Sequence, residues 1–395
     1  MEINSLIRAF NSNKITSLYV SDVNLILRQS NNIFHYILDA IIRNNSLINI
    51  HFIIRNLNNK KIVQLINALK DIRTIKKIYV IINSNSKCEF INILTKLNRC
   101  KIIFEVSVKN LSTNDNFKKF IQQKILYKYI CNTTDINDFE YIVNNSGVKS
   151  IVLSKPSNNN AKKIFSILSK LSINKLKVKI KNYNLNEDFI NYLAYYISLN
   201  KPLYKLKLFN KLNKDDLLIS YFKIIDALKY NTQIKILSLQ DLYNINVFSK
   251  VFEYNKSIET LQIYTKFIYF KIYHEHDNID DIIKSLQNNT SLKNIYINTK
   301  LNSYKEHNYN GFYNINNHSF FNELFLKNKT LQTIKMCNCG INNIDGLIEN
   351  LKSNSSLKNI NLSYNNITNI NILFEVLNIN KSLQNFSFYV KNIYY

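Results

Sequence analysis

The chain has 395 residues, of which 46% are hydrophobic and 12% aromatic, and this composition excludes a wholly disordered protein. Its formal net charge is +25, from 52 Lys and Arg against 27 Asp and Glu, a balance that suits nucleic acid, acidic proteins or anionic membranes as partners. Only four glycines are present, which excludes P-loop and dinucleotide-binding fingerprints because both need closely spaced glycines.

The positive charge has a second explanation. Lys is enriched together with Asn, Ile, Tyr and Phe, the residues with AT-rich codons, while Trp is absent and Pro occurs twice. A biased genome would raise the Lys content everywhere, and Lys is indeed scattered through almost every segment. The sequence leaves open whether the net charge has a function.

The cysteines and the N-terminus bear on location. Five cysteines form no even disulfide framework, residues 1–14 lack the basic flank and apolar run of a signal peptide, and no stretch approaches the roughly 18 apolar residues of a membrane span. We therefore expect no membrane span and a reducing, intracellular location, in the cytoplasm.

A short motif of the form L-x-x-I-x-L returns along the whole chain. Its fourteen copies start at Ile15, Leu47, Ile75, Ile103, Leu126, Val148, Ile173, Leu203, Ile234, Ile258, Leu292, Leu331, Leu357 and Leu383. The mean interval, 383 minus 15 over thirteen steps, is about 28 residues, a period typical of stacked supersecondary units. We expect one elongated domain over residues 1–395, with degenerate repeats in 1–139 and clearer ones in 140–395.

Each repeat is expected to contain one strand and one helix. The apolar residues at positions four and six of the motif share one face of a strand, and positions three, five and seven lie on the other. Helical spacing follows in 187–199, 215–230, 280–286, 343–351 and 371–377. Two long intervals predict loop insertions near 266–277 and 302–317. Two short intervals before Val148 leave open whether the N-terminal third keeps regular helices.

The clearest copy identifies a resemblance. Residues 357–367 match L-x-x-L-x-L-x-x-N-x-L with Asn365 at the Asn position, and residues 331–341 match with Cys339 there. The chain thus resembles leucine-rich-repeat proteins of the ribonuclease-inhibitor type. The resemblance implies an α/β horseshoe solenoid with a parallel concave sheet and convex helices. It also implies that Asn365 and Cys339 satisfy backbone groups where their strands end. The composition further resembles that of the repeat gene families of AT-rich insect poxviruses.

No motif predicts catalysis, a cofactor or a metal site. The densest group of possible ligands, His274-Glu275-His276-Asp277, lacks a zinc spacing and is interpreted as a solvated insertion, and Cys337 and Cys339 as residues of their own repeat. We therefore expect no enzyme and no cofactor.

The outward strand positions predict a binding surface. Lysines gather on two adjacent strands, with aromatic residues nearby: Lys175, Lys177, Lys179, Lys205, Lys207 and Phe209. Their ammonium groups would repel one another unless something acidic covered them, although a solvated lysine face is the alternative. Tyr79, Tyr264 and Tyr296 are candidate anchors, because Tyr is enriched at interface hot spots. We predict a scaffold that binds another protein, acidic in character, on the concave face. The alternative is nucleic-acid binding through the lysines, which would be strongly salt-dependent.

Overall fold

The computed structural model of the chain consists of two compact units, residues 1–173 and 174–395. The residues that it describes are 16–20, 30–44, 46, 49–54, 64–65, 67–69, 77–82, 101–106, 118, 122, 126–131, 136–153, 158–180, 187–210, 218–241, 245–266, 280–300, 318–339, 341, 344–365, 367 and 371–388.

The first unit contains six parallel strands, each paired with the next one in the chain. They are β1 (Ser17–Val20), β2 (Asn49–Ile54), β3 (Lys77–Ile82), β4 (Lys101–Val106), β5 (Leu126–Cys131) and β6 (Ser150–Leu153). The described helices are α3 (Asn31–Arg43), α7 (Ile136–Asn145), the 3-10 turn η3 (Asn158–Asn160) and α8 (Ala161–Ser169). A regular helix is therefore present in the N-terminal third, at α3, and α7 follows directly after that third.

The second unit contains eight parallel strands, again paired in chain order. They are β7 (Lys175–Ile180), β8 (Lys205–Asn210), β9 (Ile236–Gln240), β10 (Thr260–Lys266), β11 (Asn294–Lys300), β12 (Thr333–Cys337), β13 (Asn359–Asn361) and β14 (Asn385–Ser387). The helical segments between them are α9 (Glu187–Ser198), α10 (Leu218–Lys229), η5 (Ile245–Phe248), α11 (Ser249–Tyr254), α12 (Asp280–Leu286), α13 (His318–Lys327), α14 (Asp345–Ser353) and α15 (Asn371–Ile379).

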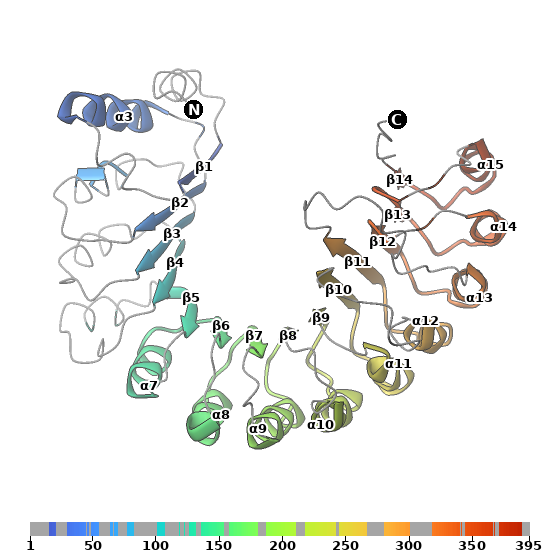
Figure 1. Cartoon of the computed structure of the whole chain (residues 1–395), viewed down its shortest axis with the longest axis horizontal. Coiled ribbons are helices and arrows are strands. Elements are labelled where there is room, and N and C mark those ends of the chain that lie inside the picture. The colour runs from blue at the N-terminus through green and yellow to red at the C-terminus, as the bar shows by residue number, and fades with distance from the viewer. Residues whose placement is uncertain are drawn as a thin grey trace, which may run out of the picture. The chain divides into compact units, whose positions relative to one another are not determined.

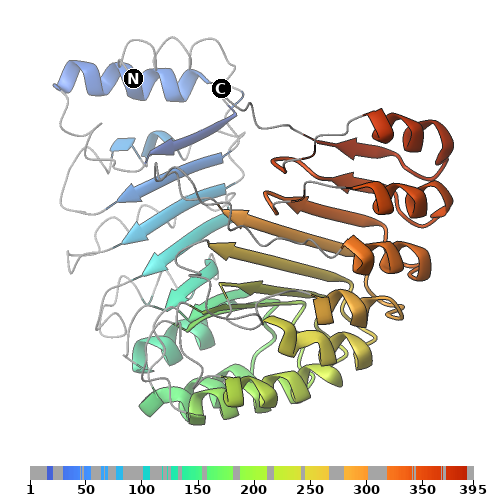
Figure 2. The same ribbon diagram turned by 45° about the vertical axis from the view of Figure 1, so that its right-hand side comes forward.

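Strands and helices of the second unit form two layers. The strands line the inner side of the curve that this unit follows, and the helices line its outer side (Figure 1). The arrows of its strands point the same way (Figure 2). We call the sheet face that points away from the helices the concave face.

Alternation along the strands determines which residues enter the core. In β7, Leu176 and Val178 are buried between Lys175, Lys177 and Lys179, which are exposed or half-buried. The first, fourth and sixth motif positions are buried in the repeats from Val148 to Leu357, as in Leu357, Ile360 and Leu362, each at most 3% exposed, and half-buried in the repeat that starts at Leu383. Each such side chain contributes about 1.5 to 3 kcal/mol, so a repeat depends on its neighbours to cover it.

A buried asparagine before each of the strands β9 to β14 links one repeat to the preceding one. Asn289 donates its amide hydrogens to the carbonyl oxygens of Phe252 and Asn255, at 2.8 and 3.4 Å. Its Oδ1 accepts from the backbone N–H groups of Ser291 and Leu292, at 3.0 and 2.7 Å. The same arrangement recurs in a set that we call the asparagine ladder: Asn231, Asn255, Asn289, Asn328, Asn354 and Asn380. The ladder supplies partners to carbonyls at helix C-termini that have no partner within their own helix.

The turns after β12 and β13 are built as the family motif implies. Asn365 is buried, donates to the carbonyls of Met336 and Leu362 at 2.7 and 2.8 Å, and accepts from the Cys339 N–H at 2.8 Å. The Cys339 thiol contacts the carbonyls of Ile297 and Cys337, at 3.8 and 3.5 Å. The two residue types thus serve the same purpose in consecutive turns.

The predicted fold class is confirmed: the described repeats form an α/β solenoid of the leucine-rich-repeat type. The helices predicted over 187–199 and 215–230 are α9 and α10, and those over 280–286, 343–351 and 371–377 are α12, α14 and α15. The predicted insertion 302–317, and 266–277 apart from Lys266 at the end of β10, lie outside the described residues. No helix within the described ranges has both the length and the apolar character needed to cross a membrane.

One predicted repeat start is wrong. A motif starting at Ile103 would place its strand from residue 105 onward, but β4 runs from Lys101 to Val106, so Ile103 lies inside it. The cause is that Ile102, Phe104 and Val106 alternate regularly, and an alternating pattern fits any register shifted by two residues. The pairing of β4 with β5 also contains an irregularity between Ile102 and Ile103.

Candidate functional site

The candidate site lies on the concave face of the second unit, at strands β7 to β10. Lys175 pairs in register with Lys205, and Lys177 pairs with Lys207, so two lysine rows cross the two strands. Lys179 pairs with Phe209 in the next row. We call Lys175, Lys177, Lys179, Lys205 and Lys207 the concave lysine patch. The sequences of β7, β8, β9 and β10 contain no Asp or Glu.

Two lysines of the patch lie over aromatic rings on strands farther along the sheet. The Lys177 Nζ lies 5.7 Å from the centroid of the Phe209 ring on β8. The Lys207 Nζ lies 5.0 Å from the centroid of the Tyr264 ring on β10, two strands away. An ammonium group over a ring face is attracted by the ring's quadrupole, so these contacts fix where the two positive charges lie.

Lys205 also reaches across β9. Its Nζ donates to Oε1 of Gln262 on β10 at 2.9 Å, while its own strand is separated from β10 by β9. Burial, and to a smaller extent the positive charge of Lys175, lowers the pKa of Lys205.

Ser238 of β9 lies beneath this crossing. It pairs in register with Lys207 on one side and Gln262 on the other, on the concave side of its strand. Its side chain is small enough for lysines from β8 to extend over β9. Ser238 is 0% exposed, and its hydroxyl has no hydrogen-bond partner within the described part of the chain.

The three tyrosines predicted as anchors occupy different places. Tyr264 belongs to the patch through Lys207. Tyr296 lies on β11, where the Lys335 Nζ is 5.4 Å from its ring centroid, and it pairs with Gln262. Tyr79 lies on β3 of the first unit, in register between His51 and Ile103. Tyr264 and Tyr296 therefore lie in the same unit as β7 and β8, and Tyr79 lies in the other unit.

Sequence reasoning placed three further residues on the outward face but did not choose them as site residues: Ser238, Gln262 and Lys335. All three occupy position five of their motifs, the same row as Lys177 and Lys207. This shared position was the signal that could have found them, because residues at the same motif position lie side by side in a parallel sheet without register shifts.

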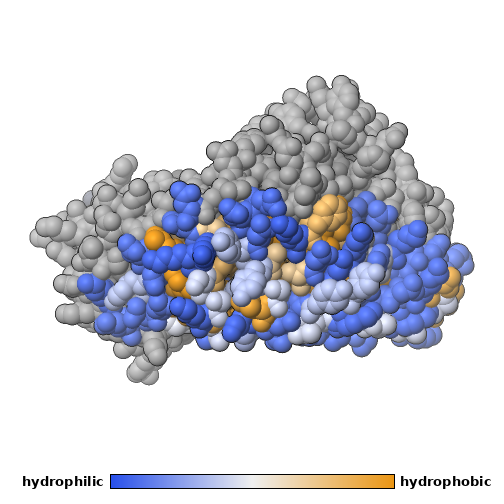
Figure 3. All heavy atoms as spheres, turned by 90° about the horizontal axis from the view of Figure 1, so that it is seen from below, coloured by the Kyte–Doolittle hydropathy of each residue, from blue (hydrophilic) through white to orange (hydrophobic). Residues whose placement is uncertain are grey.

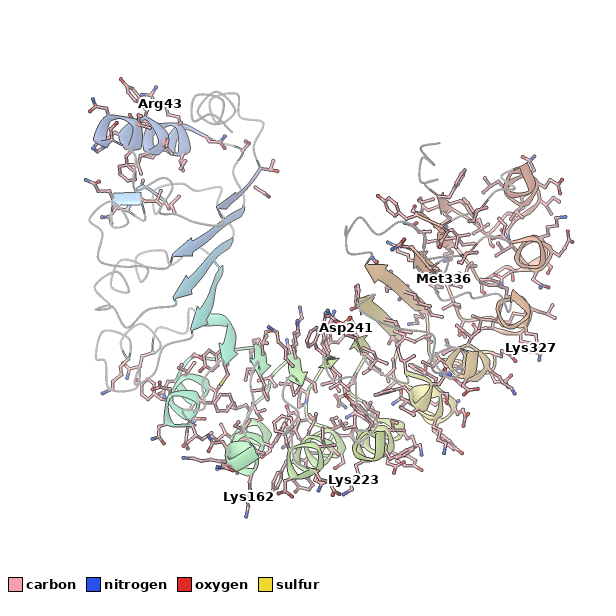
Figure 4. All side chains as sticks on the ribbon, in the orientation of Figure 1. Arg43, Lys162, Lys223, Asp241, Lys327 and Met336 are labelled. Atoms are coloured by element: carbon pink, nitrogen blue, oxygen red, sulfur yellow. The ribbon has the colours of Figure 1, made fainter. Side chains whose placement is uncertain are left out.

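The helix side of the second unit has a different charge arrangement. Several of its lysines form ion pairs between helices or within one, as in Lys223–Glu187 at 2.7 Å and Lys327–Glu323 at 2.9 Å. Lys223 and Lys327 project outward from the helices, whereas Asp241 lies on the inner side, after β9 (Figure 4). The view onto the helices around α9 and α10 is mostly hydrophilic with scattered hydrophobic spots (Figure 3).

The other clusters considered from the sequence contribute little to this site. The segment His274-Glu275-His276-Asp277 lies outside the described residues. Among the residues that are described, no group of three or more His, Cys, Asp or Glu could hold a metal ion. Cys337 is the last residue of β12. Its Sγ is 3.6 Å from Oδ1 of Asn361, and burial raises the pKa of its thiol.

No family model matches the sequence, and no curated protein matches it. Similar solved structures include a chain of the TLR13–ssRNA13 complex, with 12% identity over 88% of this chain and a TM-score of 0.35. This chain spans 40% of the length of that one. A chain of the Rad7–Elc1 complex in yeast has 16% identity, coverage of 93% and 90%, and a TM-score of 0.45. A chain of the mouse RP105/MD-1 complex has 12% identity, coverage of 96% and 67%, and a TM-score of 0.43. Similarity at this level assigns no function to the chain.

Proposed function

We propose that the chain is a non-enzymatic interaction scaffold, and that the concave face of its second unit binds an acidic partner protein. The observation that carries the proposal is the concave lysine patch, five lysines on two paired strands within a group of four strands that holds no Asp or Glu. Solvent screens such charges only partly when they are half-buried, so an acidic surface is the natural complement.

The lysines are also positioned before any partner arrives. Lys177, Lys205 and Lys207 are held by Phe209, Gln262 and Tyr264, respectively. Ordering a long side chain on binding costs about 0.5 to 1.5 kcal/mol, and this cost is smaller when the side chain is already held. Tyr264 and Tyr296 add aromatic area to the same face, although Lys207 and Lys335 lie over their rings.

The proposal is tested by exchanging the five patch lysines for Ser and measuring capture of partner proteins from the native cell, with mass spectrometry to identify them. The matched control exchanges five exposed lysines on helices and the turns after them: Lys162, Lys170, Lys201, Lys250 and Lys256. Both variants lose the same net charge. We expect the patch variant alone to lose an acidic partner, with both variants keeping their circular dichroism. Equal capture by the two variants would contradict the proposal.

Two finer points of fold are part of this proposal. We infer that the repeats are of the ribonuclease-inhibitor type, because a helix follows most described strands of the second unit. We also infer that one repeat array continues through both units, since strands in each are parallel and follow chain order. The resemblance in composition to poxvirus repeat families stays a prediction from the sequence.

We further propose an intracellular, cytoplasmic location. Asn255, Asn289, Asn328, Asn354 and Asn380 all stand in Asn-x-Ser/Thr triplets, the acceptor pattern for N-glycosylation. All five are buried, and their amide nitrogens donate to backbone carbonyls. Side chains used in this way suit a compartment without glycosylation. Expression in a secretory pathway tests this. A shift on gels after glycosidase treatment would show that the sites are modified, and the modified protein should have reduced stability.

A further inference from the structure

The spacing of the patch lysines carries information about the shape of the partner. Lys175, Lys177 and Lys179 occupy alternate residues of β7, and Lys205 and Lys207 occupy alternate residues of β8. Alternate residues of a strand repeat about every 6.7 Å, and neighbouring strands lie about 4.8 Å apart. The Cα atoms of the five lysines therefore form a grid whose longer step follows the strand direction.

We propose that the patch binds an extended acidic segment of the partner, with carboxylates on alternate residues, lying parallel to the strands over the ammonium groups that reach from β7 and β8 toward β10. This proposal rests on the proposed function, because it assumes an acidic protein as the partner. An extended chain presents alternate side chains at the same step as the lysines, so each carboxylate meets its own lysine. A helix repeats its face about every 5.4 Å and falls out of step by roughly 2.6 Å after two repeats.

The aromatic contacts favour an acidic protein segment over single-stranded nucleic acid. In proteins that bind single-stranded nucleic acid, the bases stack on the faces of aromatic side chains. In this patch, Lys177 lies over the Phe209 ring and Lys207 lies over the Tyr264 ring. A base would have to displace an ammonium group from each ring before it could stack, whereas a carboxylate can approach the ammonium groups where they lie.

Lys205 and Ser238 extend the same site. A carboxylate that approaches Lys205 competes with Gln262 for its ammonium group, which is held at 2.9 Å. Gln262 pairs in register with Ser238, so a carboxylate that takes the place of Gln262 on Lys205 comes near the buried hydroxyl of Ser238, which can donate to it. The hydroxyl has no partner among the described residues, so binding would give a buried polar group the hydrogen bond that it lacks. Ser238 is thus a specificity residue for carboxylates at this end of the patch.

The test measures binding of labelled peptides to the full chain by fluorescence anisotropy. One probe is a short peptide of alternating Glu and Thr, and a second has the same composition with all Glu in one block. A third probe is a single-stranded oligouridine. We expect the alternating peptide to bind about tenfold more tightly than the block peptide. We expect this preference to disappear in the patch variant and to persist in the control variant with Lys162, Lys170, Lys201, Lys250 and Lys256 exchanged for Ser.

Equal affinity for the two peptides would overturn the proposal, because charge alone would then explain binding. Tighter binding of oligouridine than of either peptide would overturn it in favour of nucleic acid. The Ser238→Ala variant should bind the alternating peptide about fivefold more weakly with an unchanged melting temperature. Unchanged affinity would remove Ser238 from the site. If the peptides fail while the patch variant still loses its native partner, the extended segment is wrong and the proposed function stands.

Discussion

At the scale of the residue, the asparagine ladder shows how one side chain serves two repeats. Asn289 uses its amide nitrogen on the carbonyls of the preceding repeat and its oxygen on the N–H groups of its own. An aliphatic residue could fill the same space but would leave these backbone groups buried without partners. The abundance of Asn before the strands therefore has a structural reason, whatever the codon usage of the genome.

The first prediction concerns this residue. Asn289→Ala should lower the free energy of unfolding by about 2 to 4 kcal/mol, because several buried backbone groups lose their partners at once. The neighbouring Asn288 is exposed and provides the matched control. Asn288→Ala should change stability by less than about 0.5 kcal/mol. Urea titration followed by circular dichroism measures both, and equal effects would show that the ladder contributes little.

The second prediction concerns the thiol of Cys339. Burial, with a smaller contribution from Cys337, raises its pKa well above the ordinary value of 9.0. The folded protein therefore keeps this proton at pH values where the unfolded chain releases it. Stability due to the thiol is fully present below pH 9 and falls as the pH rises above it.

Cys339→Ser removes this titration and retains a hydroxyl that can contact the carbonyls of Ile297 and Cys337. The free energy of unfolding of the variant should then fall less steeply with pH than that of the wild type between about pH 9 and 11. The two slopes should differ by up to about 1.4 kcal/mol per pH unit. Tyr196, whose phenol is also buried and has a raised pKa, accounts for part of the remaining slope. Identical slopes in urea titrations of the two proteins would show that the thiol is accessible to solvent in the native state.

At the scale of the element, most of the repeat could be read from the sequence. Apolar residues at motif positions one, four and six predict the strand face that enters the core, and the spacing of three and four predicts α9 and α12. The register of β4 could not be read, because Ile102, Phe104 and Val106 fit more than one alignment. The directions in which the Lys205 and Lys207 side chains extend could not be predicted either. They depend on the small Ser238 on β9 and on Gln262 and Tyr264 on β10.

The third prediction tests whether a repeat depends on its neighbours. Leu357 is 1% exposed before β13, and Leu357→Asp places a charge in the core without a partner. Amide hydrogen exchange should accelerate in β12, β13 and β14 and stay slow in β8. The adjacent Lys358 is exposed, and Lys358→Asp provides the control with normal exchange. Unchanged helical circular dichroism and melting temperature in Leu357→Asp would contradict nearest-neighbour stacking.

At the scale of the whole molecule, the net charge of +25 acts on stability. Like charges repel within the compact state, and salt screens them over about 10 Å at 0.1 M. Ion pairs such as Lys223–Glu187 reduce this repulsion on the helix side, whereas the patch collects lysines on strands without acidic residues.

The fourth prediction follows from this difference. The melting temperature of the wild-type chain should rise by about 2 to 4 °C between low and moderate salt. The variant with the five patch lysines exchanged for Ser should show a higher melting temperature at low salt and a weaker salt dependence. The control variant with five exposed lysines exchanged should stay closer to the wild type. Calorimetry compares all three, and a patch variant as salt-dependent as the control would show that the patch lysines do not repel one another strongly.

The asparagine ladder also bears on how such a chain can grow. Each ladder residue meets carbonyls in the repeat before it, as Asn380 does with Asn354 and Leu351, and offers its own carbonyl to the repeat after it. The repeats joined by the ladder thus have the same donor side and the same acceptor side. A gene duplication that copies one whole unit would insert a segment already compatible with both of its new neighbours, whereas a copy of half a unit would leave donors facing donors. Lineages carrying this protein should therefore vary in length by whole repeats.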